Sequence, residues 1–429
     1  MTRLILALSG ASALPAAPLR AAGLRAMVGS GILVAVGYID PGNWATDIAG
    51  GSGFGFGLVA VVLAAAVLAM GFQILTARLA LATGADLATL TARHLPRPVA
   101  QGAWLAGEAA ILATALAELI GGAIALRLLL GLPLMAGVAV TALGTLTVFY
   151  VARRNAERHE QVIAVLLGVV AMAFVYLLVR AQPQAAAVAE GVAGTARTLR
   201  DPQAFLIALG ILGATLMPHN LYLHSGTLAQ RAAGLARADR PLAMRVARND
   251  TIISLTIAML INAAIMVVAA ASLSGSGPLV ASLDGAHAAI AHTLGAGAAI
   301  VFAVALYAAG QSSTITGVMA GRVLSRGFRP AGGWSDRRRA VATRVVAGLA
   351  ASGLLATTGG QDPDSLLVLS QVILSLALPF ALIPLVTLVR RRDVMGRYAV
   401  CGAWGMTAIA ATAGIVVLDG YLLVQTLVF

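Results

Sequence analysis

Two short stretches of the sequence combine a proline with side chains that can hold a cation, and each lies inside a long apolar segment. The first reads Asp40-Pro-Gly-Asn43, and the second reads Met217-Pro-His-Asn220. Proline removes a backbone donor and clashes with the preceding helical turn, so each segment should be interrupted there. Within a membrane, the carbonyls freed by such a break must line protein or a polar cavity. Two broken helices in one membrane chain point to the binding site of a transporter.

The groups at the two breaks suit a transition-metal ion. Asp40 and Asn43 offer hard oxygen ligands, whereas Met217 offers a soft thioether sulfur. This mixture fits Mn²⁺, Fe²⁺, Co²⁺ or Cd²⁺ and gains nothing for Mg²⁺ or Ca²⁺. The backbone carbonyls of Gly37 and Ala214, each three residues before its break, lose their helical partners and can complete the coordination shell.

Structural roles are alternatives for the same side chains. An aspartate that precedes a helix accepts backbone N–H bonds, so Asp40 can act as a cap for the second half-helix. A methionine in a membrane helix usually only packs against its neighbours, which is the alternative for Met217. The coincidence of the two breaks favours ligand roles for both residues.

Further titratable residues lie within the apolar segments. Imidazole titrates near neutral pH, so His219, beside the second break, is a candidate for a proton or gating role. His224 has that role or a structural hydrogen bond between helices. Glu108 and Glu118 lie about 15 Å apart along one predicted helix, and acids at membrane depth commonly mark proton relays. Arg344 is a candidate counter-charge for Glu118.

The composition is that of an all-α, multi-pass membrane protein. Of 429 residues, 59% are hydrophobic and 11% are charged, and the mean hydropathy is +0.91. Apolar runs of roughly 20 residues are long enough to cross a hydrocarbon core of about 30 Å. Eleven such spans are predicted, at 27–54, 57–83, 100–130, 133–153, 161–181, 203–229, 249–274, 286–320, 340–358, 364–388 and 398–428.

The arginines predict the orientation of the chain. All 29 basic residues are arginine, and 25 of them fall in cytoplasmic segments if the N-terminus is inside and the C-terminus outside. The positive-inside rule therefore favours this topology. The net charge of +12 is spread over short loops, which favours anionic lipid headgroups over nucleic acid as its partner. The single cysteine, Cys401, excludes an intrachain disulfide and a cysteine cluster for metal.

The spans divide into two related halves. Each broken helix opens a run of five spans, and an odd number of spans turns the second unit upside down relative to the first, as in an inverted repeat. We expect a cytoplasmic lead-in at 1–26, a transporter core at 27–390 with repeats at about 27–181 and 203–388, and a linker with the eleventh helix at 391–429.

Several motifs resemble those of the Nramp (natural resistance-associated macrophage protein) family of divalent-metal transporters. The resemblance implies a LeuT-like 5+5 inverted repeat and proton-coupled import of Mn²⁺ or Fe²⁺. It implies that Asp40, Asn43, Met217 and the Ala214 carbonyl hold the metal, with the Gly37 carbonyl in some states, and that His219, Glu118 and span-nine arginines serve the proton path. The motifs are Gly37-Tyr-Ile-Asp40-Pro-Gly-Asn43-Trp-Ala-Thr-Asp47-Ile, Met217-Pro-His-Asn-Leu-Tyr-Leu-His224-Ser, Glu108 with Leu116-Ala-Glu118, Gln311-Ser-Ser-Thr-Ile-Thr-Gly317 and Ser370-Gln-Val-Ile-Leu-Ser375.

Three positions depart from the family pattern. Ala115 stands where the family usually has aspartate, and Ala377 stands where many members have a glutamine that faces the metal. In span nine, only Arg339 falls in place before Thr343-Arg344, where many members have two basic residues. The missing carboxylate at position 115 removes a proton acceptor, so coupling could be weakened or rerouted through His219 and Glu118.

The sequence thus favours a secondary transporter that imports Mn²⁺ or Fe²⁺, and also Cd²⁺ or Co²⁺, together with protons by alternating access. The alternatives are a metal uniporter of the same fold and a LeuT-fold symporter for a non-metal substrate. An enzyme is disfavoured because zinc-type ligand spacing is absent, and we expect no cofactor, since the metal is the substrate. The composition, rich in alanine and arginine, suggests a bacterial inner membrane, and a monomer should suffice.

Overall fold

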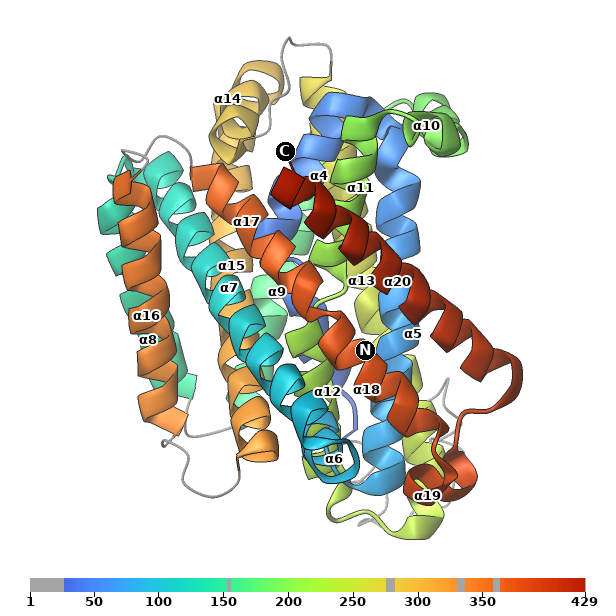
Figure 1. Ribbon diagram of the computed structural model, residues 1–429. Helices are drawn as coiled ribbons and strands as arrows, with labels where there is room; N and C mark the ends of the chain where they lie inside the picture. The colour runs from blue at the N-terminus through green and yellow to red at the C-terminus, as the bar shows by residue number, and fades with distance from the viewer. Residues whose placement is uncertain (1–26, 153–155, 275–281, 330–335, 358–362, 429) are drawn as a thin grey trace, which may run out of the picture.

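The computed structural model describes residues 27–152, 156–274, 282–329, 336–357 and 363–428 (Figure 1). Within these ranges all regular secondary structure is helical. The predicted lead-in at 1–26 lies outside the described residues, and the division of the chain into domains stays a prediction.

The first five spans correspond to α3 and α4, which form the broken helix, and to α5, α7, α8 and α9. The bounds of these helices are Ser30–Gly37, Pro41–Phe54, Val59–Thr83, Arg97–Leu130, Leu134–Ala152 and Ala156–Ala181. The second five correspond to α11 and α12, again a broken helix, and to α13, α15, α16 and the pair α17 and α18. Their bounds are Pro202–Thr215, Pro218–Ala232, Arg240–Leu273, Ala296–Phe328, Asp336–Thr357, Pro363–Ala377 and Pro379–Arg390. The eleventh span is α20, Gly402–Val428.

Both predicted helix breaks are present, and both half-helices that follow begin with a proline. Pro41 opens α4 and Pro218 opens α12, the position at which the missing N–H costs no helical hydrogen bond. Residues 38–40 and 216–217 form the non-helical connections. The breaks therefore separate helices rather than bend them.

The number of spans also agrees with the prediction. Eight helical stretches in the described residues are long and apolar enough to cross a membrane, and two shorter apolar helices lie at Leu134–Thr147 and Val341–Thr357. One of the eight, Pro41–Thr83, has 43 residues. As one straight helix it would extend about 65 Å, twice the hydrocarbon thickness, so it contains two spans. Gly55, with a φ of 56°, ends α4 and divides them.

The eighth predicted span, 286–320, is wrong at its start. The structure places a separate helix, α14, at Leu283–Leu294, and the spanning helix α15 starts only at Ala296. Between them lies Gly295, whose φ of 100° is unfavourable for other residues. The apolar run continues through this turn, so hydropathy alone does not reveal it. Two other starts are also too late, since α9 begins at Ala156 and α13 at Arg240.

The broken helices lie at the centre of the helix bundle. Helix α3 packs against α13, α15, α12 and α9, and α4 packs against α13, α11, α17 and α7. At one edge of the molecule stand α8 and α16, and at the other stand α5 and α20 (Figure 1). Two short helices that the arginine rule places outside, α10 (Ala185–Thr198) and α14, lie at one end of the bundle. Two that it places inside, α6 (Leu87–His94) and α19 (Arg392–Met395), lie at the other.

Candidate metal-binding site

Asp40 combines the two roles that the sequence left open. Its side chain is fully buried, and its Oδ1 accepts the backbone N–H of Asn43 at 2.9 Å, so it caps α4. Its Oδ2 is also buried and has no hydrogen-bond partner among the described residues. A buried carboxylate oxygen without a partner is costly unless a cation neutralises it. One oxygen therefore holds the helix start, and the other is available to a ligand.

The backbone around the first break offers a second candidate ligand group. In an α-helix the carbonyl of Gly37 would accept from the N–H of residue 41, but this residue is a proline. The Asn43 side chain is oriented by its Nδ2, which donates to the Tyr38 carbonyl at 3.0 Å. Its amide oxygen therefore points away from that carbonyl.

The second break repeats this arrangement. The helical donor for the Ala214 carbonyl would be the N–H of residue 218, which is again a proline. Met217 is buried and packs with alanines of α7 and with residues of α17, including Ala377. Its Sδ lies 3.5 Å from Nδ2 of Asn220. Met217 thus packs as a core residue does, while its sulfur remains in a polar neighbourhood.

Asn220 brings the two breaks together. A Cβ atom added to Gly37 would lie 2.6 Å from Oδ1 of Asn220, so the end of α3 is in direct contact with the start of α12. Because Asn220 also contacts the sulfur of Met217, it connects the carbonyl end of one broken helix with the candidate ligand atom of the other. Asn220 lies in the second sequence motif, but its contact with Gly37 could not be predicted from that motif.

A network of polar side chains lies beside the breaks. It is on the side that the arginines predict to be cytoplasmic. Gln73 of α5 donates to the Tyr38 hydroxyl at 3.0 Å and contacts Nδ1 of His224 at 2.9 Å. Asn262 of α13 donates to the Tyr38 carbonyl at 2.7 Å. His224 therefore has the structural contact between helices that the sequence left as one of its two alternatives. Gln73 and Asn262 were not among the predicted site residues. Their polar side chains within apolar spans are the sequence signal that could have identified them.

A cavity of about 410 Å³ lies on the other side of the breaks. It is lined by α4, α11, α17 and α20. Thr46 and Gln371 are among its polar lining residues, and the Gln371 side chain lies against Gly42, between Asp40 and Asn43. The cavity is therefore adjacent to the break, on the side that the arginine rule predicts to be external.

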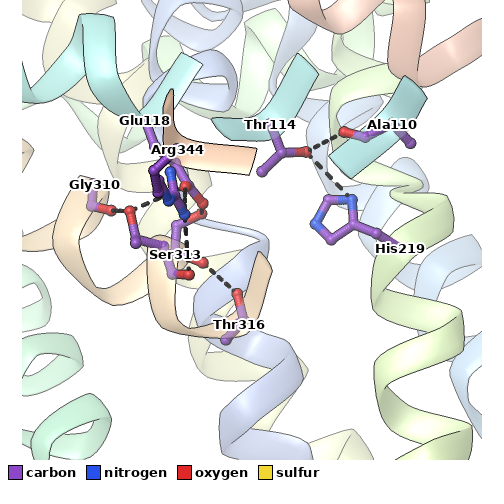
Figure 2. Close-up of polar contacts among 9 residues, drawn as sticks. Ala110, Thr114, Glu118, His219, Gly310, Ser313, Thr316 and Arg344 are labelled. Atoms are coloured by element: carbon purple, nitrogen blue, oxygen red, sulfur yellow. Dashed lines mark hydrogen bonds and ion pairs between the residues drawn. The ribbon is translucent and has the colours of Figure 1, made fainter. Parts of the chain in front are cut away.

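His219 lies next to the second break and faces α7. Its Nδ1 lies 3.4 Å from Oγ1 of Thr114, and Figure 2 shows the two side chains turned toward each other. Since the Thr114 hydroxyl donates to the Ala110 carbonyl at 2.9 Å, its oxygen is able to accept from Nδ1 in the tautomer of His219 that carries the proton there. The other nitrogen, Nε2, is buried without a partner among the described residues and is free to accept a proton.

Glu118 and Arg344 form the ion pair that the sequence suggested. Arg344 Nη2 lies 2.8 Å from Oε2 of Glu118, and both side chains are buried. Ser313 and Thr314 of α15 also donate to the Glu118 carboxylate, at 2.8 and 3.0 Å. Thr114 and Glu118 are four residues apart on α7. His219 and the Glu118–Arg344 ion pair therefore contact adjacent turns of this helix (Figure 2).

Glu108 is only partly buried, unlike Glu118. It forms an ion pair with Arg339 and accepts a hydrogen bond from the Trp104 indole at 3.0 Å. Its side chain remains 26% exposed. This position is near the start of α7 at Arg97, whereas Glu118 lies in the middle of the bundle.

Next to Ala115 lie a small cavity and two nitrogen atoms of Arg344 that lack hydrogen-bond partners among the described residues. Ala115 lines a cavity of about 10 Å³ together with Glu118 and Arg344. Nε and Nη1 of Arg344 are buried without a partner among the described residues. A carboxylate at 115 would lie about one turn before Glu118 on the same helix. The expected family residue would thus face an arginine that is short of acceptors.

Two membrane helices broken at prolines, meeting in the centre of an all-α bundle, define a multi-pass membrane protein with the LeuT-type architecture of secondary transporters. The family model described as "Natural resistance-associated macrophage protein-like" matches residues 31–425. The chain therefore belongs to the Nramp family.

Individual relatives agree with this assignment. The chain is 46% identical to the divalent metal cation transporter MntH of Brucella suis over 91% of its length and 85% of that protein. It is 42% identical to MntH 1 of Pseudomonas aeruginosa, with 96% and 95% of the two chains covered.

Solved structures confirm the fold. A crystal structure of the Eremococcus coleocola manganese transporter superimposes with a TM-score of 0.85 at 31% identity, over 95% of this chain and 87% of that one. The structure of MhsT in complex with L-phenylalanine matches with a TM-score of 0.60 at 19% identity, over 93% and 97% of the two chains. At this identity the similarity to MhsT concerns the fold alone.

Proposed function

We propose that this protein imports a divalent transition metal across a bacterial inner membrane by alternating access. The names of its relatives, which include divalent metal cation transporters and a manganese transporter, support this function. The proposed ligands are the side chains of Asp40, Asn43 and Met217 and the backbone carbonyls of Ala214 and Gly37.

The contact of Asn220 with both breaks is the observation that carries the proposal. It places the end of α3 against the start of α12, and each of the two breaks leaves one carbonyl without its helical donor. Asp40 Oδ2 supplies a carboxylate oxygen without a partner in the same region. These groups are all acceptors, so a cation is the ligand that satisfies them together.

The donor set also supports a preference among metals. Carboxylate, amide and carbonyl oxygens are hard ligands, and one thioether adds affinity for softer ions. The site should therefore favour Mn²⁺, Fe²⁺, Co²⁺ and Cd²⁺ over Mg²⁺ and Ca²⁺, which take oxygen ligands alone. No resident cofactor is required, because the metal is the substrate.

The surroundings of the breaks support alternating access. The cavity of about 410 Å³ is adjacent to the breaks on the predicted outer side. On the inner side, hydrogen bonds of Gln73 on α5 connect Tyr38, at the first break, with His224 of α12. The arrangement corresponds to an outward-facing state, and import requires these inner contacts to separate.

Proton coupling is part of the proposal, and the proposed proton path follows side chains along α7. His219 would accept a proton at Nε2 beside the metal, and Glu118 with Arg344 would receive it one turn away. Glu108 and Arg339 would continue the path toward the cytoplasm, whereas His224 would act in gating. Ala115 favours a second candidate function, a metal uniporter, because it removes a carboxylate from the middle of this path.

Transport into proteoliposomes that contain a pH-sensitive dye distinguishes these functions. External Mn²⁺ should enter and acidify the lumen if import is proton-coupled. Uptake of Mn²⁺ without acidification would identify a uniporter. Uptake no greater than in protein-free liposomes would overturn the proposal.

A further inference from the structure

The last membrane helix carries a buried acid that the proposed mechanism does not use. Asp419 of α20 is only 7% exposed, although most of this helix lies at the edge of the bundle. Ser375 of α17 donates a hydrogen bond from its Oγ to Oδ1 of Asp419. The other oxygen, Oδ2, is buried without a hydrogen-bond partner among the described residues. A carboxylate so placed is costly unless it faces a water-filled cavity or takes up a cation.

Ser375 connects this acid to the metal site and to the outer cavity. A Cβ atom added to Gly213 of α11 would lie 2.7 Å from Oγ of Ser375, and Gly213 directly precedes Ala214, a proposed ligand. Ser375 also lines the cavity of about 410 Å³, together with Gln425 of α20. One hydroxyl therefore separates Asp419 from the cavity and from the backbone of the second break.

No basic side chain of the helices packed against α20 is paired with Asp419 in the described residues. These helices are α18, α11, α17 and α5. Arg390 of α18 lies against Gly405, 14 residues before Asp419, or about 21 Å along the helix. Arg78 of α5 donates to the Tyr398 carbonyl. The acids nearby are also engaged elsewhere: Asp201 caps α11, and Asp364 accepts from the N–H of Leu283.

We propose that Asp419 is a proton-binding carboxylate on the outer side of the metal site, and that it takes part in the proton movement that accompanies metal import. This inference rests on the proposed function. A proton fits the site better than a metal does, because one carboxylate oxygen suffices for a proton, whereas a divalent ion needs several ligands in place of its water. Hydronium in the cavity gives its proton to Oδ2, which leaves a neutral carboxyl group and one water molecule.

Asp419 is an acid on a different helix from position 115, where this chain lacks the acid that is usual in its family. The acid missing at position 115 belongs to α7, a different helix from the one that carries Asp419. Asp419 supplies an acid on α20 instead. It accepts a hydrogen bond from Ser375, whose hydroxyl lies against Gly213 of α11. It is thus a second acid for proton exchange, independent of Glu118.

Infrared difference spectroscopy of the full chain in lipid tests proton binding directly. As the pH falls from about 8 to about 5, a range in which a proton-exchanging group of this kind is useful, the C=O band of a protonated carboxyl group should grow. Asp419→Asn should remove this contribution while it preserves an acceptor for Ser375. Asp419→Glu is the matched control and should retain it. Ser375→Ala should shift the frequency of the band, since the hydroxyl no longer contacts the carboxyl group; this variant keeps the test valid if Asp419→Asn fails to fold.

The same variants in proteoliposomes test the role in transport. Asp419→Asn should reduce metal-evoked acidification at least about fivefold, as expected for a lost proton relay at membrane depth, while calorimetric Mn²⁺ affinity stays within about twofold, which is less than 0.5 kcal/mol. A spectrum of Asp419→Asn that keeps the band, or acidification equal to that of the unmodified protein, would overturn the inference and leave Asp419 as a hydrogen-bond partner of Ser375. A failure of the proposed coupling is distinguishable, because acidification would then be absent from the unmodified protein as well, whereas the infrared band would still report on Asp419.

Discussion

Asp40 and Asn43 are joined by a hydrogen bond that uses one of the two carboxylate oxygens of Asp40. Oδ1 of Asp40 accepts the backbone N–H of Asn43 at 2.9 Å, and Oδ2 is left buried without a partner among the described residues. The cap fixes the carboxylate at the start of α4, where the Asn43 side chain is also oriented. One oxygen of this side chain therefore caps the helix, and the other is left for the proposed role as a metal ligand.

The substitution Asp40→Asn separates these functions. Asparagine is as good a cap as aspartate, so the fold should persist, but the charged ligand is lost. Since even the loss of an outer partner of a metal ligand costs about 10–100-fold in affinity, we expect Mn²⁺ binding to fall more than about 100-fold. Isothermal titration calorimetry of the purified protein measures this. Asp86→Asn, which alters another capping aspartate, at the start of α6, serves as the control and should bind Mn²⁺ normally.

The sulfur of Met217 should matter most for soft metals. Met217→Leu preserves the volume that packs against Leu374 and Ala377 but removes the thioether. We expect Cd²⁺ affinity to fall about tenfold, equivalent to about 1.4 kcal/mol, and Mn²⁺ affinity to fall less because manganese is harder. Met266→Leu is the matched control, since Met266 is buried on α13 against Gly50, away from the breaks. Equal losses for both metals would argue against a role for sulfur.

The close contact at Gly37 predicts that even one methyl group is harmful there. In Gly37→Ala the new Cβ would overlap the Asn220 side chain and force the two breaks apart. Overpacking of this kind typically costs about 1–3 kcal/mol, and we expect both a lower melting temperature and slower Mn²⁺ uptake. Gly71→Ala on α5 meets nothing within 4 Å and should have neither effect. If both variants behaved alike, the contact between the breaks would not constrain the site.

Glu118 and Glu108 should differ in their effects because they differ in burial. Glu118→Gln leaves the buried Arg344 without its carboxylate, and breaking such a pair costs about 3–5 kcal/mol. Glu108→Gln affects a pair with Arg339 that solvent screens in part, so a loss of about 1 kcal/mol or less is expected. Thermal unfolding in detergent compares the two. A larger loss for Glu108→Gln would show that the buried pair is not the main support of this region.

Much of the site could be predicted from the sequence because proline has a local effect. Pro41 and Pro218 determine where the helices break and which carbonyls lose their donors, whatever surrounds them. The pairing of Glu118 with Arg344 could also be suggested, since both are charges in apolar spans and neither is stable there alone.

The remaining contacts depend on which helices become neighbours, and the sequence does not specify this. Asn220 contacts Gly37 across 183 positions, and Ser375 meets Asp419 only because α17 packs on α20. The division at Gly295 was missed for a different reason: the residues on both sides are apolar or small, so hydropathy continues through the turn. Similarly, Glu108 could not be separated from Glu118 by type, because its exposure follows from its place closer to the start of α7.

Uptake of radiolabelled Mn²⁺ into proteoliposomes tests the central claim most directly. The unmodified protein should show saturable uptake that Cd²⁺ inhibits and that a similar concentration of Ca²⁺ does not, since the site includes a thioether. The Asp40→Asn protein, reconstituted at the same density, should take up no more than protein-free liposomes. Equal uptake by the two proteins would contradict the assignment of the metal site to the two helix breaks.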